Sequence, residues 1–213
     1  AEPLGLLVTP AVDDDRVYDS IAQAINVHGV AVGYTWDWDD EDPVTDPNDN
    51  EARRLYPVMY KNGEVINLIQ AKDDYWDGRT FDINDNGYAV GHAYKRVNGT
   101  IRNKFFYVDT NKPANEVDIV QPEDFFNSSS STARGINNNN LVVGYGQVET
   151  HNENGGSRRT HGFLYDINAG TFTDVNNLIT CNNDYTVFEA TDINDLNEIT
   201  AAAVVSVHKK DAK

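Results

Sequence analysis

A short motif recurs four times along the chain and narrows the folds open to it. Each copy places Ile-Asn before a turn rich in Gly, Asn and Asp, and a run of small apolar residues follows the turn. The copies begin at Ile25, Ile83, Ile136 and Ile193. Their spacings of 58, 53 and 57 residues are nearly equal. This regularity predicts a repeat protein of about four similar units.

Each unit has room for about four short strands. Segments such as 20–25, 79–81 and 185–188 precede the motif and read as extended. After the motif come an aromatic-rich segment (58–60, 105–107, 163–165) and a short apolar strand ending near residue 69, 120 or 179. Gly, Asn and Asp fall at the turns, where positive φ is tolerated. Because no stretch sustains a helical period, we expect an all-β protein.

Radially repeated four-stranded units of this size are typical of a β-propeller. We expect a single repeat domain over 1–213, with units anchored at 25–69, 83–120, 136–179 and 193–207. The last unit breaks off after its second strand. Since residues 5–8 resemble 162–165, the segment 4–10 is predicted to supply the missing strand and close the ring. The alternative is an open fragment of a larger propeller or array.

The turn that follows Ile-Asn allows two interpretations. Residues 82–87 fit the first half of an EF-hand loop, but Ala93 stands where the bidentate Glu should be. The favoured interpretation is structural: Asn bonds the turn backbone, Ile fills the core, and Gly or Asn takes the left-handed position. The fourth copy is the best of the weak calcium candidates, with Asp192, Asn194, Asp195, Asn197 and Glu198.

Two other recurrent positions are expected to be structural. The small residues that follow the motif are predicted to line a crowded central channel, where they let the blades approach. They are Gly33, Gly91, Gly144 and Ala201. The recurrent tyrosines are predicted to form core between the blades rather than a ligand cage. They are Tyr60, Tyr107 and Tyr165.

An acidic segment lengthens the first unit between its second and third strands. Eight carboxylates and no Lys or Arg lie within residues 35–51. Clustered carboxylates repel one another unless a cation neutralises them, so one interpretation is a calcium site. Its candidate ligands are Asp37, Asp39, Asp40, Glu41 and Asp42. Trp36 and Trp38 are candidate ligand contacts that could stack on sugar rings. The competing interpretation is a solvated acidic loop.

The composition and the absence of certain motifs argue against several classes of partner and of functional site. With 34 acidic and 17 basic residues the net charge is −17, which argues against nucleic acid or an anionic membrane surface as partner. No apolar run approaches the roughly 20 residues of a membrane span. The single Cys181 and five histidines without metal-ligand spacing predict neither a disulfide framework nor a zinc site. No cofactor motif and no catalytic constellation is visible.

The repeat residues resemble a known pattern. Residues 24–33 and 134–144, with 162–166, are similar to the HAF repeat of probable extracellular bacterial proteins. The Asn-rich, acidic style and the phrase Asp192-Ile193-Asn194-Asp195 before an Ala-Val strand resemble a family of unknown function, DUF3466. The likeness covers 20–205. It implies a secreted, cell-surface or periplasmic protein and supplies no catalytic residues.

Two function classes follow. The first is an extracellular binding or interaction module for a protein or glycan ligand, with loops at one propeller face as its contact surface. The alternative is a secreted enzyme, a lyase or hydrolase, with calcium assisting. The first is favoured because no set of nucleophile, base and oxyanion donors can be picked out.

Overall fold

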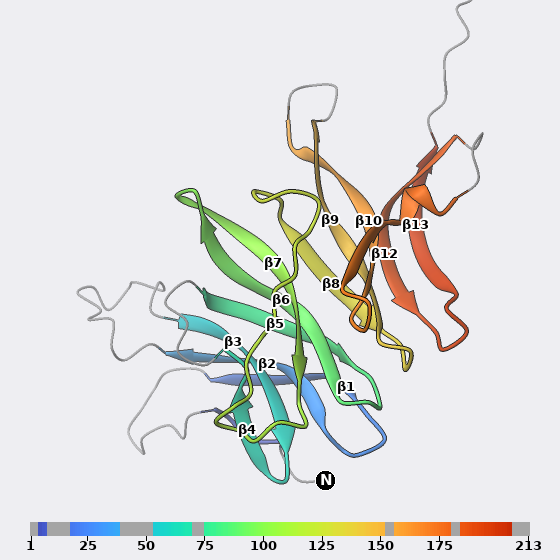
Figure 1. Cartoon of the computed structure of the whole chain (residues 1–213). Coiled ribbons are helices and arrows are strands. Elements are labelled where there is room, and N and C mark those ends of the chain that lie inside the picture. The colour runs from blue at the N-terminus through green and yellow to red at the C-terminus, as the bar shows by residue number, and fades with distance from the viewer. Residues whose placement is uncertain are drawn as a thin grey trace, which may run out of the picture.

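The computed structural model describes residues 4–7, 18–38, 53–69, 75–151, 156–179 and 184–205. Over these residues the chain consists of antiparallel strands in four sheets, with one short 3₁₀ turn, η2 (Val175–Asn177). Figure 1 shows the four sheets side by side in chain order. The prediction of an all-β protein is confirmed. No helix within these ranges is long and apolar enough to cross a bilayer.

The strands of every sheet are hydrogen-bonded in chain order, so each unit is a meander. The first sheet contains β1 (Asp19–Ile25), β2 (Ala31–Trp38), β3 (Arg53–Lys61) and β4 (Glu64–Asn67). The second contains β5 (Tyr75–Ile83), β6 (Tyr88–Val97) and β7 (Thr100–Asp109). The third contains β8 (Ser131–Ile136), β9 (Leu141–His151), β10 (Arg158–Asp166) and β11 (Thr171–Asp174), and the fourth β12 (Tyr185–Ile193) and β13 (Ile199–Val205).

The fourth strands differ in detail from expectation. In the second unit this strand is reduced to one bridge, in which Tyr107 and Val120 exchange backbone hydrogen bonds of 3.0 and 2.8 Å. β4 and β11 end before the predicted residues 69 and 179. Each ends at a capping side chain: Asn67 Oδ1 accepts the N–H of Ile69, and Asp174 Oδ1 accepts that of Asn176. Such local bonds compete with the strand ladder and end it.

Apolar cores lie between successive sheets. One cluster joins the first sheet to the second, a second joins the second to the third, and a smaller one joins the third to the fourth. The predicted inter-unit role of Tyr107 and Tyr165 is confirmed, since their rings stack 6.1 Å apart in the middle core. Tyr60 lies instead in a cluster within the first sheet.

The Ile of the second, third and fourth motifs packs against the preceding sheet. Ile83, Ile136 and Ile193 are only 5–6 % exposed and belong to the three inter-sheet cores. Ile25 is 67 % exposed, because no described sheet precedes the first. The motif therefore fastens each unit to the one before it.

The small residues after the motif have a different role from the one expected. A Cβ added at Gly33, Gly91 or Gly144 would lie 1.9–2.1 Å from a carbonyl oxygen of the adjacent first strand. The close approach occurs beside a bulge in that strand, so glycine is required inside each sheet. The expectation that these residues line a central channel is not supported. In the fourth unit Ala201 stands at the glycine position and pairs with Ala190 beside the corresponding bulge.

Ring closure is not seen. Within the described ranges β13 pairs only with β12. The N-terminal residues lie instead at the first sheet, where a Cβ on Gly5 would be 3.3 Å from Val65 on β4. The described chain is thus a stack of four meander units whose first and fourth sheets lie at opposite ends (Figure 1).

Candidate functional site

The Ile-Asn turns form a hydrogen-bonded ladder along one edge of the stack. Asn26 Nδ2 donates to the carbonyl oxygen of Asn84 at 3.2 Å, and Asn84 Nδ2 donates to that of Asn137 at 2.8 Å. Asn137 Nδ2 continues the series to the carbonyl of Asn194 at 2.9 Å. Each asparagine therefore holds the turn of the following unit.

The same asparagines also cap their own turns. Their Oδ1 atoms accept backbone N–H groups four residues on, from Val30, Tyr88, Leu141 and Glu198. The left-handed position of the turn is taken by Gly or Asn, as expected, with φ of 76°, 84°, 63° and 65° at Gly29, Gly87, Asn140 and Asn197. These bonds give the motif the structural role that was favoured for it.

The ladder ends differently in the fourth unit. Asn194 Nδ2 donates to Glu198 Oε2 of its own turn at 2.7 Å. The equivalent Nδ2 atoms of the other three asparagines donate to the turn of the next unit. Glu198 and Thr200 also replace apolar residues that face the next sheet in the other units, such as Tyr88 and Val90. The outer face of the last sheet is therefore more polar at this end than the same face of the other sheets. Among the described residues, no group of three His, Cys, Asp or Glu side chains could hold a metal ion.

A buried carboxylate supports the ladder between the second and third units. Asp82 accepts the N–H of Ile83 and, across the interface, the N–H of Ile136, both at 2.9 Å. Burial raises the pKa of Asp82 to about 6, although the two N–H bonds oppose the shift; the charge of Asp192 adds to it.

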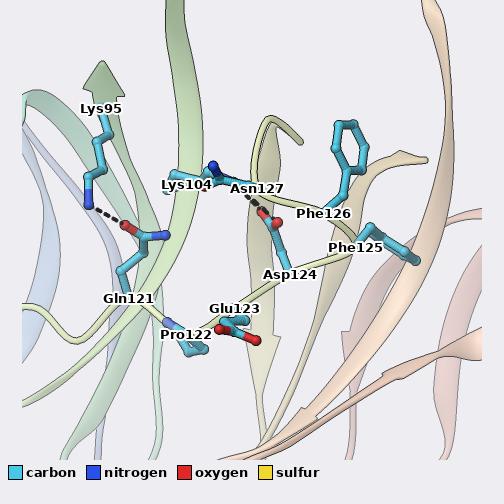
Figure 2. A pocket seen from close by; sticks show the side chains of 9 residues that line it. All are labelled: Lys95, Lys104, Gln121, Pro122, Glu123, Asp124, Phe125, Phe126 and Asn127. Atoms are coloured by element: carbon cyan, nitrogen blue, oxygen red, sulfur yellow. Dashed lines mark hydrogen bonds and ion pairs between the residues drawn. The ribbon is translucent and has the colours of Figure 1, made fainter. Parts of the chain in front are cut away.

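A cavity of about 490 Å³ lies on the second unit, at the end of the strands opposite the ladder. Lys95 on β6 and Lys104 on β7 form one wall, and the connection to the third unit forms the other. Its lining is polar with three apolar residues, and consists of Lys95, Lys104, Gln121, Pro122, Glu123, Asp124, Phe125, Phe126 and Asn127. Figure 2 shows Asp124 directed at Lys104, and Lys95 directed at Gln121.

A buried ion pair fixes the inner wall of this cavity. Lys104 Nζ lies 2.9 and 3.1 Å from the two carboxylate oxygens of Asp124, and the side chains are 4 % and 2 % exposed. Ser131 Oγ donates to the same carboxylate at 2.7 Å and accepts the N–H of Phe105. Burial raises the pKa of the Asp124 carboxyl, while the bonds from Ser131 and Lys104 work against that shift. The pair ties the connecting segment to β7 and β8.

The outer wall is less constrained. Lys95 Nζ donates to Gln121 Oε1 at 3.3 Å, and Glu123 and Asn127 are exposed. Phe125 packs edge-on against Phe172, with ring centroids 4.9 Å apart, which anchors the segment to the third sheet. The cavity thus offers amine, amide and carboxylate groups on a fixed support.

The third unit has a counterpart of the ion pair. Gly91 pairs with Phe106 and Gly144 with Phe163, so the register makes His161 the equivalent of Lys104. His161 Nδ1 lies 2.6 Å from Asp174 Oδ2. Although burial opposes it, the bonds from His161 and Asn176 lower the pKa of Asp174. A third-strand Lys or His that contacts a carboxylate at or beyond the fourth strand therefore recurs.

A row of arginines and aromatic rings crosses the first three units. The guanidinium of Arg79 lies 5.0 Å from the centre of the Tyr34 ring, and that of Arg134 lies 5.2 Å from Phe81 and 5.7 Å from Tyr145. His92 lies between these groups. Burial, followed by the charges of Arg79 and Arg134, lowers its pKa to about 4, so it is neutral at neutral pH.

Of the residues predicted for the acidic-segment calcium site and the sugar contacts, Trp36 alone has a described side chain. Trp36, on β2, lines a small cavity of about 50 Å³ together with Leu55, Asp77, Gly78, Arg79, His92 and Tyr94. Asp37 and Trp38 end β2, but their side chains lie outside the described part of the structure, as do Asp39, Asp40, Glu41 and Asp42 entirely. The predicted calcium site and the ligand role of Trp38 stay predictions.

Sequence reasoning missed the cavity and its ion pair. One signal was available: Lys104 directly precedes the apolar 105–107 segment, within a strand whose neighbours enter the core. A lysine at such a position needs a buried partner. Nothing in the repeat pattern identifies Asp124 as that partner, because residues 121–130 lie outside the repeat units.

Stacked meander sheets, bonded turns and one polar cavity define an all-β repeat protein with a pocket on its second unit. The chain belongs to the family described as Protein of unknown function (DUF3466), whose model matches residues 1–213. The resemblance to this family is thereby confirmed, whereas the likeness to the HAF repeat stays a prediction. No curated protein and no solved structure matches the chain.

Proposed function

We propose that the chain is an extracellular or cell-surface binding module that takes a glycan in the cavity beside Lys104 and Asp124. The carrying observation is a cavity of about 490 Å³ whose inner wall is a buried ion pair. Its size falls in the range of roughly 300–1,000 Å³ that small-ligand sites occupy. The location rests on the likeness of the repeats to the HAF pattern.

The lining favours a ligand rich in hydroxyl groups. Gln121 and Asn127 can each donate and accept, Glu123 accepts and Lys95 donates. Two lysines face two carboxylates, so the wall carries no net charge of its own. With −17 on the whole chain, a polyanionic ligand would be repelled. A neutral sugar unit suits both conditions.

The fold supports a binding role by holding the wall in place. The connecting segment is fixed by the Lys104–Asp124 pair at one point and by Phe125 against the third sheet at another. A preformed wall reduces the entropy lost on binding. Face-to-face meander sheets are the building units of a propeller, and we include a propeller-like arrangement of this array in the proposal.

A glycan microarray probed with the full chain tests this function, followed by calorimetry with any glycan retained. Gln121→Ala and Glu123→Gln should each weaken binding about tenfold, the value of one lost hydrogen bond to a charged or well-placed group. Glu116→Gln, at an exposed residue outside the cavity, is the matched control and should bind as the wild type does. Absence of binding to every glycan, or binding that neither cavity variant alters, would contradict the proposal.

A further inference from the structure

The dipeptide Asn-Gly occurs in three different settings within the described chain. Asparagine is a chemically labile residue. A following glycine leaves its side-chain amide open to attack by the next backbone nitrogen, because glycine has no Cβ to hinder the approach. The three pairs are Asn62-Gly63, Asn86-Gly87 and Asn98-Gly99, and a fourth pair, at 154–155, lies outside the described residues.

Two of the pairs form exposed hairpin tips. Asn62-Gly63 joins β3 to β4 and Asn98-Gly99 joins β6 to β7, each as a two-residue loop between paired residues. Both residues of each loop have positive φ, 54° and 80° in the first and 50° and 78° in the second, as in type I′ turns. Among the described residues, a Cβ on Gly63 or Gly99 would meet nothing beyond its chain neighbours within 4 Å. Open space therefore surrounds both loops.

The third pair lies in the hydrogen-bonded ladder of turns. Asn86 Nδ2 donates to the carbonyl oxygen of Asn138 at 2.8 Å and to Asn140 Oδ1 at 2.9 Å. The carbonyl oxygen of Asn86 accepts from Asn111 Nδ2 at 2.8 Å, and the N–H of Gly87 donates within the turn at 3.1 Å. A Cβ on Gly87 would lie 2.5 Å from Asn111 Nδ2, so this turn is also crowded. Both the side-chain amide and the peptide group of the pair are thus held in place.

We propose that Asn62 and Asn98 are sites of spontaneous deamidation and that the ladder protects Asn86 from the same reaction. The backbone nitrogen of the following glycine forms a bond to Cγ and gives up its proton. The Cγ–Nδ2 bond breaks, and Nδ2 leaves with its electron pair and that proton as ammonia. Water then opens the cyclic imide at either carbonyl and gives aspartate or isoaspartate.

The reaction requires the asparagine side chain to turn toward the glycine nitrogen. At Asn86 this movement would break the bonds to the third unit, whereas at the two hairpin tips it meets open space. Each event adds a negative charge to the chain. The isoaspartate product also adds an atom to the backbone of a two-residue turn, so the pairing of the residues beside it should loosen.

Peptide mapping of the full chain by mass spectrometry, after incubation in mildly alkaline buffer, tests the proposal. Trypsin places the three pairs in separate peptides, 62–72, 80–95 and 97–102. An isoaspartate-specific methyltransferase, used as a reagent, identifies the product that the cyclic route alone yields. Asn62 and Asn98 should convert, and Asn86 should convert at least about tenfold more slowly, the effect on a rate of two hydrogen bonds that must first break. In urea that unfolds the chain the three rates should become similar.

A double variant tests the protection itself. Asn140→Gly removes an acceptor of Asn86 Nδ2 and suits the left-handed backbone there, and Asn111→Ala removes the donor to the Asn86 carbonyl. Together they should raise the rate at Asn86 and leave that at Asn98 unchanged. Asn168→Ala, which removes a bond to Asn140 and none to Asn86, is the matched control.

Three results would overturn the proposal. The first is equal rates at the three pairs of the folded chain. The second is an absence of isoaspartate at Asn62 and Asn98. The third is a double variant in which Asn86 stays as slow as in the wild type, since the bonds of the ladder would then not be the cause of its protection.

Discussion

At the scale of single residues, the motif asparagine performs two tasks that no other residue type combines. Its Oδ1 caps the turn of its own unit, and its Nδ2 holds the turn of the next. Aspartate could accept the first set of bonds but could not donate the second. This explains why Asn recurs in all four copies while the residues around it vary.

We expect Asn84→Ala to lower the free energy of unfolding by about 2–4 kcal/mol, because it removes several hydrogen bonds and leaves buried partners unpaired. Asn84 bonds Tyr88, Asn137 and Asn140. Asn194→Ala is the matched comparison: its side chain bonds only within the last turn, so the loss should be about 1 kcal/mol. Urea unfolding measures both. Equal losses would show that the bonds between units contribute little.

Asp82 should make stability depend on pH. Its pKa is raised from 3.8 to about 6 in the folded chain, so the folded state holds a proton that the unfolded state has lost. The free energy of unfolding should therefore fall by about 1–3 kcal/mol as pH rises through that window. Asp82→Asn should remove this decline. Urea unfolding should therefore show that the free energy of unfolding of the variant rises relative to that of the wild type between pH 4 and 7. A difference in free energy of unfolding that stays constant with pH would contradict this prediction.

His92 should change the free energy of unfolding in the opposite direction to Asp82 over nearly the same pH range. Its pKa is lowered to about 4, so the unfolded state binds a proton more readily and stability rises as pH increases toward 6.5. The two groups partly cancel in the wild type. His92→Gln should consequently uncover the decline caused by Asp82, and urea unfolding of this variant from pH 4 to 7 should give the steeper curve. A flatter curve than that of the wild type would reject the assignment.

At the scale of strands and connections, the Lys104–Asp124 pair fastens the segment that crosses from the second unit to the third. Lys104→Met should destabilise the chain by about 3–5 kcal/mol, because it leaves a buried carboxylate unpaired. Adding Asp124→Asn should recover most of that loss, since neither remaining group is then charged. Chemical denaturation of the single and double variants measures the difference. An unchanged Lys104→Met variant would mean that water reaches the carboxylate.

The sequence located the units, the turns and most strands, because the Ile-Asn pattern and the glycines are local signals. The register between the strands was not predicted. Matching 105–107 to 163–165 by aromatic residues places Phe105 opposite the glycine of its unit, whereas Phe106 takes that position. Phe105 faces the third sheet and Phe106 the first. A slip of one residue reverses the face of a strand, and hairpin pairing decides it.

The cavity could not be found from the sequence for a related reason. Its inner wall joins Lys104 on β7 to Asp124 in a connection that lacks the repeat pattern. The bridge at Val120 turns that connection back along β7 and brings the two residues together. Contacts created by a returning connection have no local signature.

At the scale of the whole molecule, calcium bound at the predicted site would raise the free energy of unfolding, because the ion would bind the folded chain and not the unfolded one. A cation bound only to the folded chain adds about 2.7 kcal/mol at a hundredfold excess over Kd. Melting in EDTA, in millimolar CaCl₂ and in NaCl of equal ionic strength tests the acidic segment 37–51. A rise in Tm with calcium alone, abolished by Asp39→Asn with Asp40→Asn, supports a site. Identical curves in calcium and sodium identify a solvated loop.

The bonded turns lie at one end of the strands, and this gives the two ends different tolerance to change. Connections at the other end range from residues 98–99 to residues 39–52, while the ladder end keeps Asn26, Asn84, Asn137 and Asn194. An engineer displaying foreign peptides on this scaffold would therefore graft them between Asn98 and Gly99. Each graft would leave the hydrogen bonds of the asparagine ladder unchanged. The loops at one end of the strands can therefore vary in sequence while the turns at the other end keep the sheets in place.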